Sequence, residues 1–257
     1  MSRLEIDREF LSPPEGVQRT VRVWLPDAYD SNSARRFPVL YLHDGQNLFA
    51  HPDSALPQTW EVDVAMQGLI DEGLDPWIVV AIDHRGVHRL SDYSPWDSPA
   101  EGVQGLGPRY AAFLTDHLKP QMDRSLRTRP EPQWTAVGGS SLGGLISLHL
   151  GLTRPDVFGR VAALSPSVMW ADRRLFAEWT THVPLRIYLD AGAREQIVRE
   201  GRTYDYGGST RAFSEHLRKL GYGSKNLKAV FERGGAHSEV DWRRRLPGAL
   251  RWLLARR

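Results

Sequence analysis

The chain has 257 residues, of which 41% are hydrophobic and 25% charged, and its formal net charge is +2. This composition is typical of a folded globular protein and excludes a disordered chain. The chain contains no cysteine, which excludes disulfides, thiolate metal sites, iron–sulfur clusters and a cysteine nucleophile. Any chemistry must therefore rest on Ser, Thr, Asp, Glu, His or Lys.

The same sequence limits the location and partners of the protein. No stretch reaches the roughly 18 consecutive apolar residues that a membrane helix needs. The N-terminus has no basic segment followed by an apolar stretch and a cleavage site, so we expect a soluble protein of the cytoplasm. Basic residues are not gathered in one stripe, which argues against nucleic-acid binding. We expect neither a membrane nor a nucleic acid as partner, and a homo-oligomer stays open.

The hydrophobic pattern changes along the chain. Near the N-terminus, Val21, Val23 and Leu25 alternate with Arg22 and Trp24, as in an antiparallel strand. Further on, short continuous apolar runs alternate with segments of helical length, which is typical of strands buried on both faces. The predicted strands are 39–42, 78–82, 134–137, 161–164, 185–189 and 227–231, and the predicted helices are 61–72, 106–118, 142–153, 172–179, 209–220 and 239–255. This order predicts one α/β domain, residues 1–257, with a mostly parallel central sheet, antiparallel N-terminal strands and helices on both faces.

A candidate nucleophile lies just after the predicted strand 134–137, in Gly139-Ser140-Ser141-Leu142-Gly143, which contains the pattern GxSxG. A nucleophile elbow needs a strand before the serine, a helix after it, and glycine two positions to either side, because the tight turn leaves no room for a Cβ there. Ser141 meets all three conditions, whereas Ser140 has Leu142 in the second position. We predict Ser141 as the nucleophile; the alternative is a glycine-rich turn that only packs closely.

A serine hydroxyl needs a general base, which in this arrangement is usually histidine. In the order typical of α/β-hydrolases the histidine follows the serine, which leaves His149, His182, His216 and His237. The first lies within a predicted helix, the second precedes a strand and the third lies in mid-helix. Only His237 follows the last predicted strand, so we predict His237 as the base, with a structural loop histidine as the alternative.

Two backbone amides are needed to stabilise the negative charge that develops on the substrate oxygen. One is the amide of Leu142, at a helix N-terminus. The second is expected after the strand 39–42, where Gly45 permits a tight turn and points to the amide of Gln46. We expect His43-Asp44 only to end that strand.

With these residues in place, the sequence resembles the esterase family of α/β-hydrolases that includes esterase D, the enterochelin esterases and the feruloyl and acetylxylan esterases. The resemblance covers roughly residues 18–255. It rests on the segment 41–49, on Trp60, on Arg89 with Asp92 to Pro95, on the elbow 139–144, and on Gly234 to His237 followed by Trp242 and Arg243. It implies the α/β-hydrolase fold and an enzyme that cleaves carboxylic esters.

We therefore expect a serine esterase that forms an acyl-enzyme on Ser141, acts on a small-molecule ester and needs no metal or cofactor. The alternatives are an acyltransferase to a sugar or thiol acceptor, and a non-catalytic binding protein on the same fold. Trp170 and Trp96 are candidates for the substrate pocket, with ordinary packing as the alternative. We expect Arg89 and Asp92 to form an ion pair that holds their loop.

The catalytic acid is expected after the strand 185–189, since a carboxylate must hold and stabilise the imidazole. Asp190 ends the strand, whereas Glu195 lies five positions later, in a spacing that resembles that of family members. We favour Glu195 because a residue further along the loop can reach the histidine loop. Asp190 stays an alternative, and so does a pair of serine and histidine without an acid.

Overall fold

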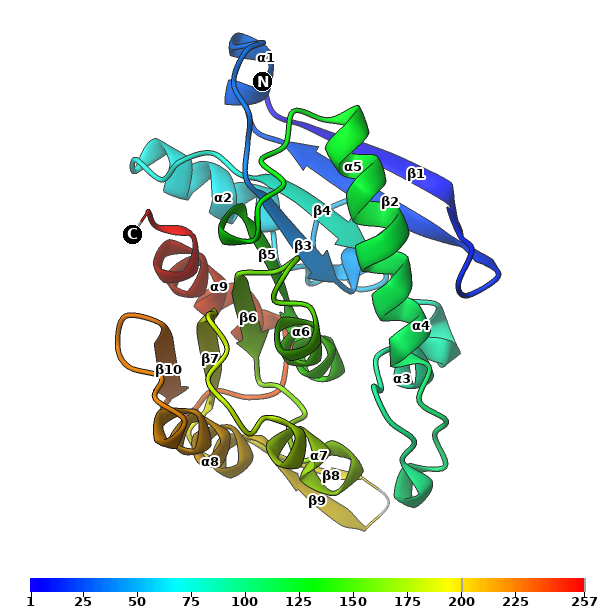
Figure 1. Ribbon diagram of the computed structural model, residues 1–257, viewed down its shortest axis with the longest axis vertical. Helices are drawn as coiled ribbons and strands as arrows, with labels where there is room; N and C mark the ends of the chain where they lie inside the picture. Colours follow the sequence, from blue (N-terminus) through cyan, green and yellow to red (C-terminus); the bar gives the residue numbers. More distant parts are fainter. Residues whose placement is uncertain (200, 257) are drawn as a thin grey trace.

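The computed structural model describes residues 1–199 and 201–256, and within these residues eight strands form one sheet in the order β1-β2-β4-β3-β5-β6-β7-β10 (Figure 1). β1 pairs antiparallel with β2 and β2 antiparallel with β4, and the other pairs are parallel. The strands are β1 Arg3–Ser12, β2 Val17–Leu25, β3 Val39–His43, β4 Ile78–Ile82, β5 Thr135–Ser140, β6 Arg160–Leu164, β7 Arg186–Gly192 and β10 Leu227–Glu232, and a separate hairpin is formed by β8 Gln196–Arg199 and β9 Arg202–Asp205. The predicted mostly parallel sheet with an antiparallel start is confirmed.

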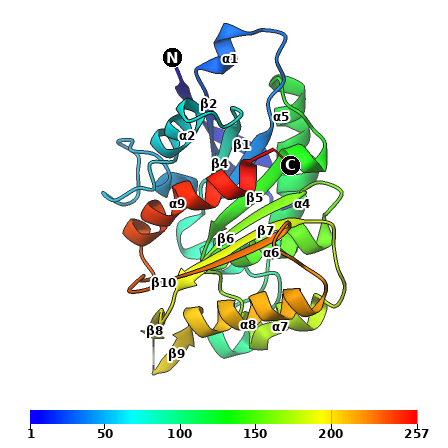
Figure 2. The same ribbon diagram turned by 90° about the vertical axis from the view of Figure 1, so that its left-hand side faces the viewer.

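Helices cover both faces of this sheet (Figures 1 and 2). The helices are α1 Ala28–Ser31, α2 Val62–Asp71, α3 Arg89–Asp92, α4 Gly107–Ala112, α5 Lys119–Ser125, α6 Leu142–Thr153, α7 Trp170–Glu178, α8 Tyr206–Lys219 and α9 Glu239–Leu254. α2 and α9 pack against one face, while α4, α5, α6 and α8 contribute to the hydrophobic core on the other. Within the described residues, no helix combines the length and the apolar character needed to span a membrane.

The central parallel strands have continuous apolar sequences because their side chains contribute to a hydrophobic core on each side of the sheet. In β3, Val39 and Tyr41 belong to the core under α6, whereas Leu40 and Leu42 belong to the core under α2 and α9. Successive side chains of a strand point to opposite faces, so both sets are buried. The sheet is thus a rigid layer from which the loops at its carboxyl edge project.

Two local features differ from the expected elements. The predicted helix 106–118 continues through α4, a π-helical segment Phe113–Leu118 and α5. Pro120 lies just after the π-helical segment, where the regular α-helical hydrogen-bond pattern is already interrupted. The hairpin β8–β9 was not expected from the sequence, since both strands are short and largely exposed and show no apolar run.

The packing of α6 can be tested by truncating one of its core side chains. Leu145 is fully buried in the first turns of α6, so Leu145→Ala should lower the free energy of unfolding by about 2–5 kcal/mol through lost burial and a new cavity. Val64 is 62% exposed on α2, so Val64→Ala should change that free energy by no more than about 0.5 kcal/mol. Urea denaturation measures both, and equal losses would contradict the described packing.

Candidate active site

Ser141 lies at a sharp turn between β5 and α6. Its backbone angles are φ 56° and ψ −123°, which a residue with a side chain rarely adopts. A Cβ on Gly139 would lie 3.0 Å from the carbonyl carbon of Gly143, and one on Gly143 would lie 3.2 Å from Asp44 Oδ2. The strand, the strained turn, the helix and the crowded flanks that an elbow requires are therefore all present at Ser141.

The two candidate oxyanion amides come from adjacent loops. Leu142 is the first residue of α6, where backbone N–H groups have no partner inside the helix. Gln46 lies in a 3-10 turn, Gly45–Asn47, directly after β3. Its side chain makes two hydrogen bonds to the backbone of His84, in which Oε1 accepts from the amide at 3.1 Å and Nε2 donates to the carbonyl at 3.3 Å. This side chain fixes the loop that carries the Gln46 amide.

The prediction that Arg89 and Asp92 form an ion pair is wrong. Arg89 instead makes a two-pronged ion pair with Asp44, at 2.7 and 2.8 Å, while Asp92 pairs with Arg19 and Arg85. Burial alone would raise the pKa of the Asp44 carboxyl, but the charge and hydrogen bonds of Arg89 hold that pKa below its ordinary value. Asp44 has φ 60°, so the pair holds a left-handed turn at the base of the Gln46 loop. The carboxylate does more than end the strand, because it orders the loop beside the elbow.

His237 and Glu195 are in direct contact. His237 Nδ1 lies 2.6 Å from Glu195 Oε1, and the Glu195 side chain is almost completely buried. Burial alone would raise the pKa of Glu195, but hydrogen bonds from His237 and from the Gly192 amide, the latter 2.6 Å long, bring that pKa below its ordinary value. Glu195 therefore stays ionised beside the imidazole, as a carboxylate that orients a histidine must.

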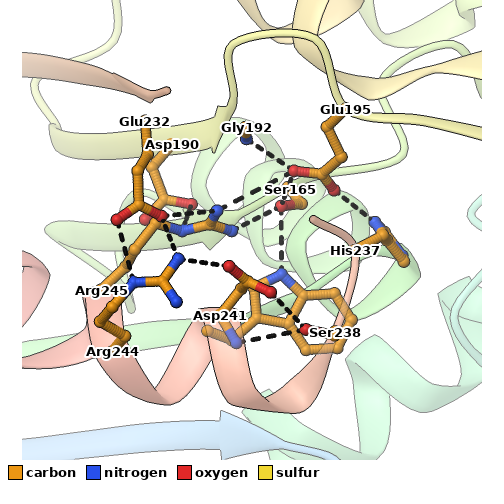
Figure 3. A network of polar contacts seen from close by, with 11 residues as sticks. Ser165, Asp190, Gly192, Glu195, Glu232, His237, Ser238, Asp241, Arg244 and Arg245 are labelled. Atoms are coloured by element: carbon orange, nitrogen blue, oxygen red, sulfur yellow. Dashed lines mark hydrogen bonds and ion pairs between the residues drawn. The ribbon is translucent and has the colours of Figure 1, made fainter. Parts of the chain in front are cut away.

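Asp190, the alternative acid, faces a different partner. Its carboxylate is fully buried and lies 3.2 Å from Arg245 Nε (Figure 3). Burial raises the pKa of Asp190 to about 7, although Arg245 opposes this shift. Of the two carboxylates, Glu195 is the one that contacts His237.

Ser141 is linked to His237 through two further side chains. Ser141 Oγ lies 3.4 Å from Ser167 Oγ, which lies 3.4 Å from the Tyr206 hydroxyl. The Tyr206 and His237 rings are in contact, with their centroids 4.0 Å apart and their planes inclined by 39°. Across residues 1–199 and 201–256 there is no direct hydrogen bond between Ser141 and His237; such bonds are often long until substrate binds.

The two candidate pocket tryptophans have different surroundings. Trp170 donates a hydrogen bond to Ser94 Oγ at 2.6 Å and lines a cavity of about 410 Å³ next to the β8–β9 hairpin. Trp96 packs edge-to-face on His149 with ring centroids 5.4 Å apart. Trp170 thus borders a cavity whose lining includes neither Ser141 nor His237, whereas Trp96 makes a packing contact.

Sequence reasoning missed several residues around the site. Ser167 and Tyr206 lie between Ser141 and His237, and Ser165 contacts Glu195. Glu239 accepts hydrogen bonds from Trp60 Nε1 and, at 3.2 Å, from Asn47 Nδ2, next to Gln46. The only signal for Ser165 and Ser167 was their place at a strand end, and Glu239 reads as an ordinary first-turn acid of a helix.

Taken together, these residues form an arrangement that can support nucleophilic attack by a serine. A serine stands at a strained turn, two amides lie at the ends of neighbouring loops, and a histidine is held by an ionised carboxylate. Such an arrangement on an α/β sheet, at the carboxyl ends of its parallel strands, defines the class of α/β-hydrolases.

Comparison with known proteins gives the family. The family described as "Putative esterase" matches residues 13–253, so the chain belongs to this family and is an esterase. This confirms the resemblance seen in the sequence.

Similar proteins are found among curated sequences and among solved structures. The chain is 24% identical over 256 residues to the "Uncharacterized protein YbbA" of Bacillus subtilis, covering 95% of each chain. It is 26% identical over 204 residues to "Ferri-bacillibactin esterase BesA" of Bacillus subtilis, covering 69% of this chain and 67% of the relative. A solved structure of a ferulic acid esterase has a TM-score of 0.75 and 19% identity, and covers 99% of this chain and 98% of that one, which shows a common fold.

We expect the buried carboxyl of Glu239 to make the free energy of unfolding of the protein depend on pH. Burial raises the pKa of Glu239 to about 7, against the lowering effect of its bonds from Trp60 and Asn47. Because the unfolded carboxyl ionises near its ordinary value, the folded state loses stability as the pH rises from about 5 to about 8. Glu239→Gln removes this loss, so the stability of the variant relative to the wild type should increase over that range.

Thermal or urea unfolding measured at pH 5, 6, 7 and 8 tests this. Glu72→Gln is the matched control, because Glu72 is an exposed carboxylate paired with Arg251, and it should give no such trend. A flat difference for Glu239→Gln would show that the Glu239 carboxyl titrates alike in the folded and unfolded chains.

Proposed function

We propose that the protein is a serine carboxylic-ester hydrolase that works through an acyl-enzyme on Ser141. The observation that carries the proposal is the close contact of His237 with the ionised Glu195, in a chain whose Ser141 stands at an elbow. Family membership supports ester hydrolysis as the reaction.

In the first half of the reaction, Ser141 Oγ attacks the ester carbonyl carbon while His237 accepts the hydroxyl proton. The amides of Gln46 and Leu142 donate hydrogen bonds to the resulting oxyanion. The bond between the carbonyl carbon and the alcohol oxygen then breaks, and His237 gives its proton to the leaving alcohol. The acyl group is left on Ser141.

In the second half, water attacks the acyl-enzyme and His237 takes its proton. Collapse of the second oxyanion breaks the bond to Ser141 Oγ, which recovers a proton from His237. Glu195 keeps the imidazole oriented and balances its charge in both halves. This chemistry uses no cofactor and no metal.

We propose a small-molecule ester as the substrate, with Trp170 in the wall of its pocket. The names of the relatives, which include a ferri-bacillibactin esterase and a ferulic acid esterase, support this class. A panel of p-nitrophenyl esters of increasing chain length, followed by feruloyl, acetyl-sugar and siderophore esters, would define the acyl and alcohol parts. A cytoplasmic location and a homo-oligomer stay predictions.

The register of the elbow gives a direct test of the nucleophile. Ser141→Ala should abolish ester hydrolysis, because no acyl-enzyme can form, while circular dichroism and thermal unfolding stay close to the wild type. Ser140 is the last residue of β5 and is the matched control, so Ser140→Ala should retain turnover. An inactive Ser140 variant together with an active Ser141 variant would show that Ser140, and not Ser141, is the nucleophile.

A second pair of variants tests the acid. Glu195→Gln should reduce kcat/KM by about 100-fold or more, equivalent to about 2.7 kcal/mol, because the imidazolium loses its counter-charge. Asp190→Asn should lose less than about tenfold, since Asp190 contacts Arg245. The reverse pattern would assign the acid to Asp190, and small losses in both would leave serine and histidine working alone.

A further inference from the structure

The second oxygen of the Glu195 carboxylate has a partner that the reaction described above does not use. Ser165 Oγ donates a hydrogen bond to Glu195 Oε2 at 2.9 Å, on the side of the carboxylate away from His237 (Figure 3). Ser165 is completely buried and directly follows β6. The carboxylate is thus held at both oxygens.

The direction of the Ser165 hydrogen bond is fixed by its other neighbours. Ser165 Oγ accepts from Trp242 Nε1 at 3.1 Å and from Arg245 Nη2 at 2.8 Å. An indole and a guanidinium can only donate. The single hydroxyl proton of Ser165 is therefore directed to Glu195, and the hydroxyl cannot turn away without losing a bond.

Arg245 brings a buried positive charge to the same network. Its side chain is 4% exposed, and its guanidinium lies 3.2 Å from Asp190, 3.7 Å from Glu232 and 4.0 Å from Glu195 Oε2. Loss of such a charge from among buried carboxylates is costly, because their charges are then uncompensated. Arg245 is thus a buried cation beside the two buried carboxylates, Asp190 and Glu195.

The backbone of Ser165 strengthens this interpretation. Its φ is 42°, in the left-handed region that favours glycine, where a side chain costs about 1–3 kcal/mol. Glycine would relieve this strain but would leave Trp242, Arg245 and Glu195 without their common partner. The hydroxyl is the feature that a glycine at this position would lack.

We propose that Ser165 and Arg245 are positioning residues for the catalytic carboxylate, holding Glu195 Oε2 so that Oε1 faces His237 and balancing part of the Glu195 charge. The inference rests on the proposed roles of Glu195 and His237. The charged groups around this network are Asp190 on β7, Glu195 and His237 in loops, Glu232 on β10, and Asp241, Arg244 and Arg245 on α9.

The pH dependence of kcat/KM separates this role from simple packing. Removing the Arg245 charge makes it easier for His237 to take up a proton, so Arg245→Gln should move the acid limb of the profile to higher pH. Arg245→Lys keeps the charge and should return the limb toward the wild-type position. If Arg245 only supported the loop, displacement of Glu195 would leave the imidazolium without its counter-charge, and the limb would move to lower pH.

Ser165→Ala tests the hydroxyl with the loss of a single atom. It should lower kcat by about tenfold or more while KM changes by less than about threefold, because the carboxylate is held less firmly while the substrate pocket is unaltered. Arg244→Gln is the matched control on the same helix. Arg244 is half exposed and pairs with Glu232 and Asp241, so this variant should leave kcat and the acid limb unchanged.

The inference is overturned if Ser165→Ala keeps its kcat, or if Arg245→Gln leaves the acid limb in place or moves it to lower pH. It is equally overturned if Arg244→Gln moves the limb as far as Arg245→Gln does. Loss of activity in Glu195→Gln alongside unaffected Ser165 and Arg245 variants would reject only this inference. An active Glu195→Gln variant would reject the proposed acid as well.

Discussion

The left-handed backbone of Ser141 is the constraint around which the site is built. A residue with a side chain adopts this conformation at a cost of about 1–3 kcal/mol, so the surrounding structure must hold it. The Ser141 amide donates to the Leu164 carbonyl at 3.0 Å, and the Ser141 carbonyl accepts from the amides of Leu145 and Ser167. The turn is thereby tied both to the strand beside it and to the helix after it. The same bonds determine where the hydroxyl and the Leu142 amide lie.

The other half of the site depends on α9. This helix begins two residues after His237 and carries Trp242, whose ring meets the His237 ring edge-on, and Arg245, which faces the acids. Its N-terminal Glu239 also accepts a hydrogen bond from Asn47, the neighbour of Gln46. One helix thus contacts His237, the polar network behind Glu195 and the loop that carries Gln46. Its docking on the sheet sets the distances between groups that are nearly 200 residues apart in the chain.

Residues whose roles follow from local pattern could be predicted from the sequence. The elbow at Ser141 is defined by its own neighbours, and the buried strands could be recognised because burial on both faces makes them continuously apolar. Glu195 could be favoured over Asp190 because its position in the loop gives it reach. In each case a short segment carries the physical information.

Pairings that depend on the folded arrangement could not be predicted in this way. Arg89 was expected to pair with Asp92, three residues away, but it meets Asp44, which the sheet brings beside it. Ser165 gives no sign in the sequence that its hydroxyl is enclosed by two donors from α9. The hairpin β8–β9 is exposed and has no periodic pattern to reveal it. Long-range partners decide the contacts of Arg89 and Ser165, and the local hairpin lacks an apolar pattern, so a linear reading of the sequence reveals neither.

The central claim is that Ser141 carries the acyl group, and it can be tested by trapping that group. The protein is mixed with a p-nitrophenyl ester, quenched in acid within the first turnover, digested and analysed by mass spectrometry. The account predicts that the peptide containing Ser140 and Ser141 gains the mass of the acyl group, and that fragmentation places the acyl group on Ser141. Rapid release of p-nitrophenol with the acyl group on Ser140, on another residue or on none would contradict it.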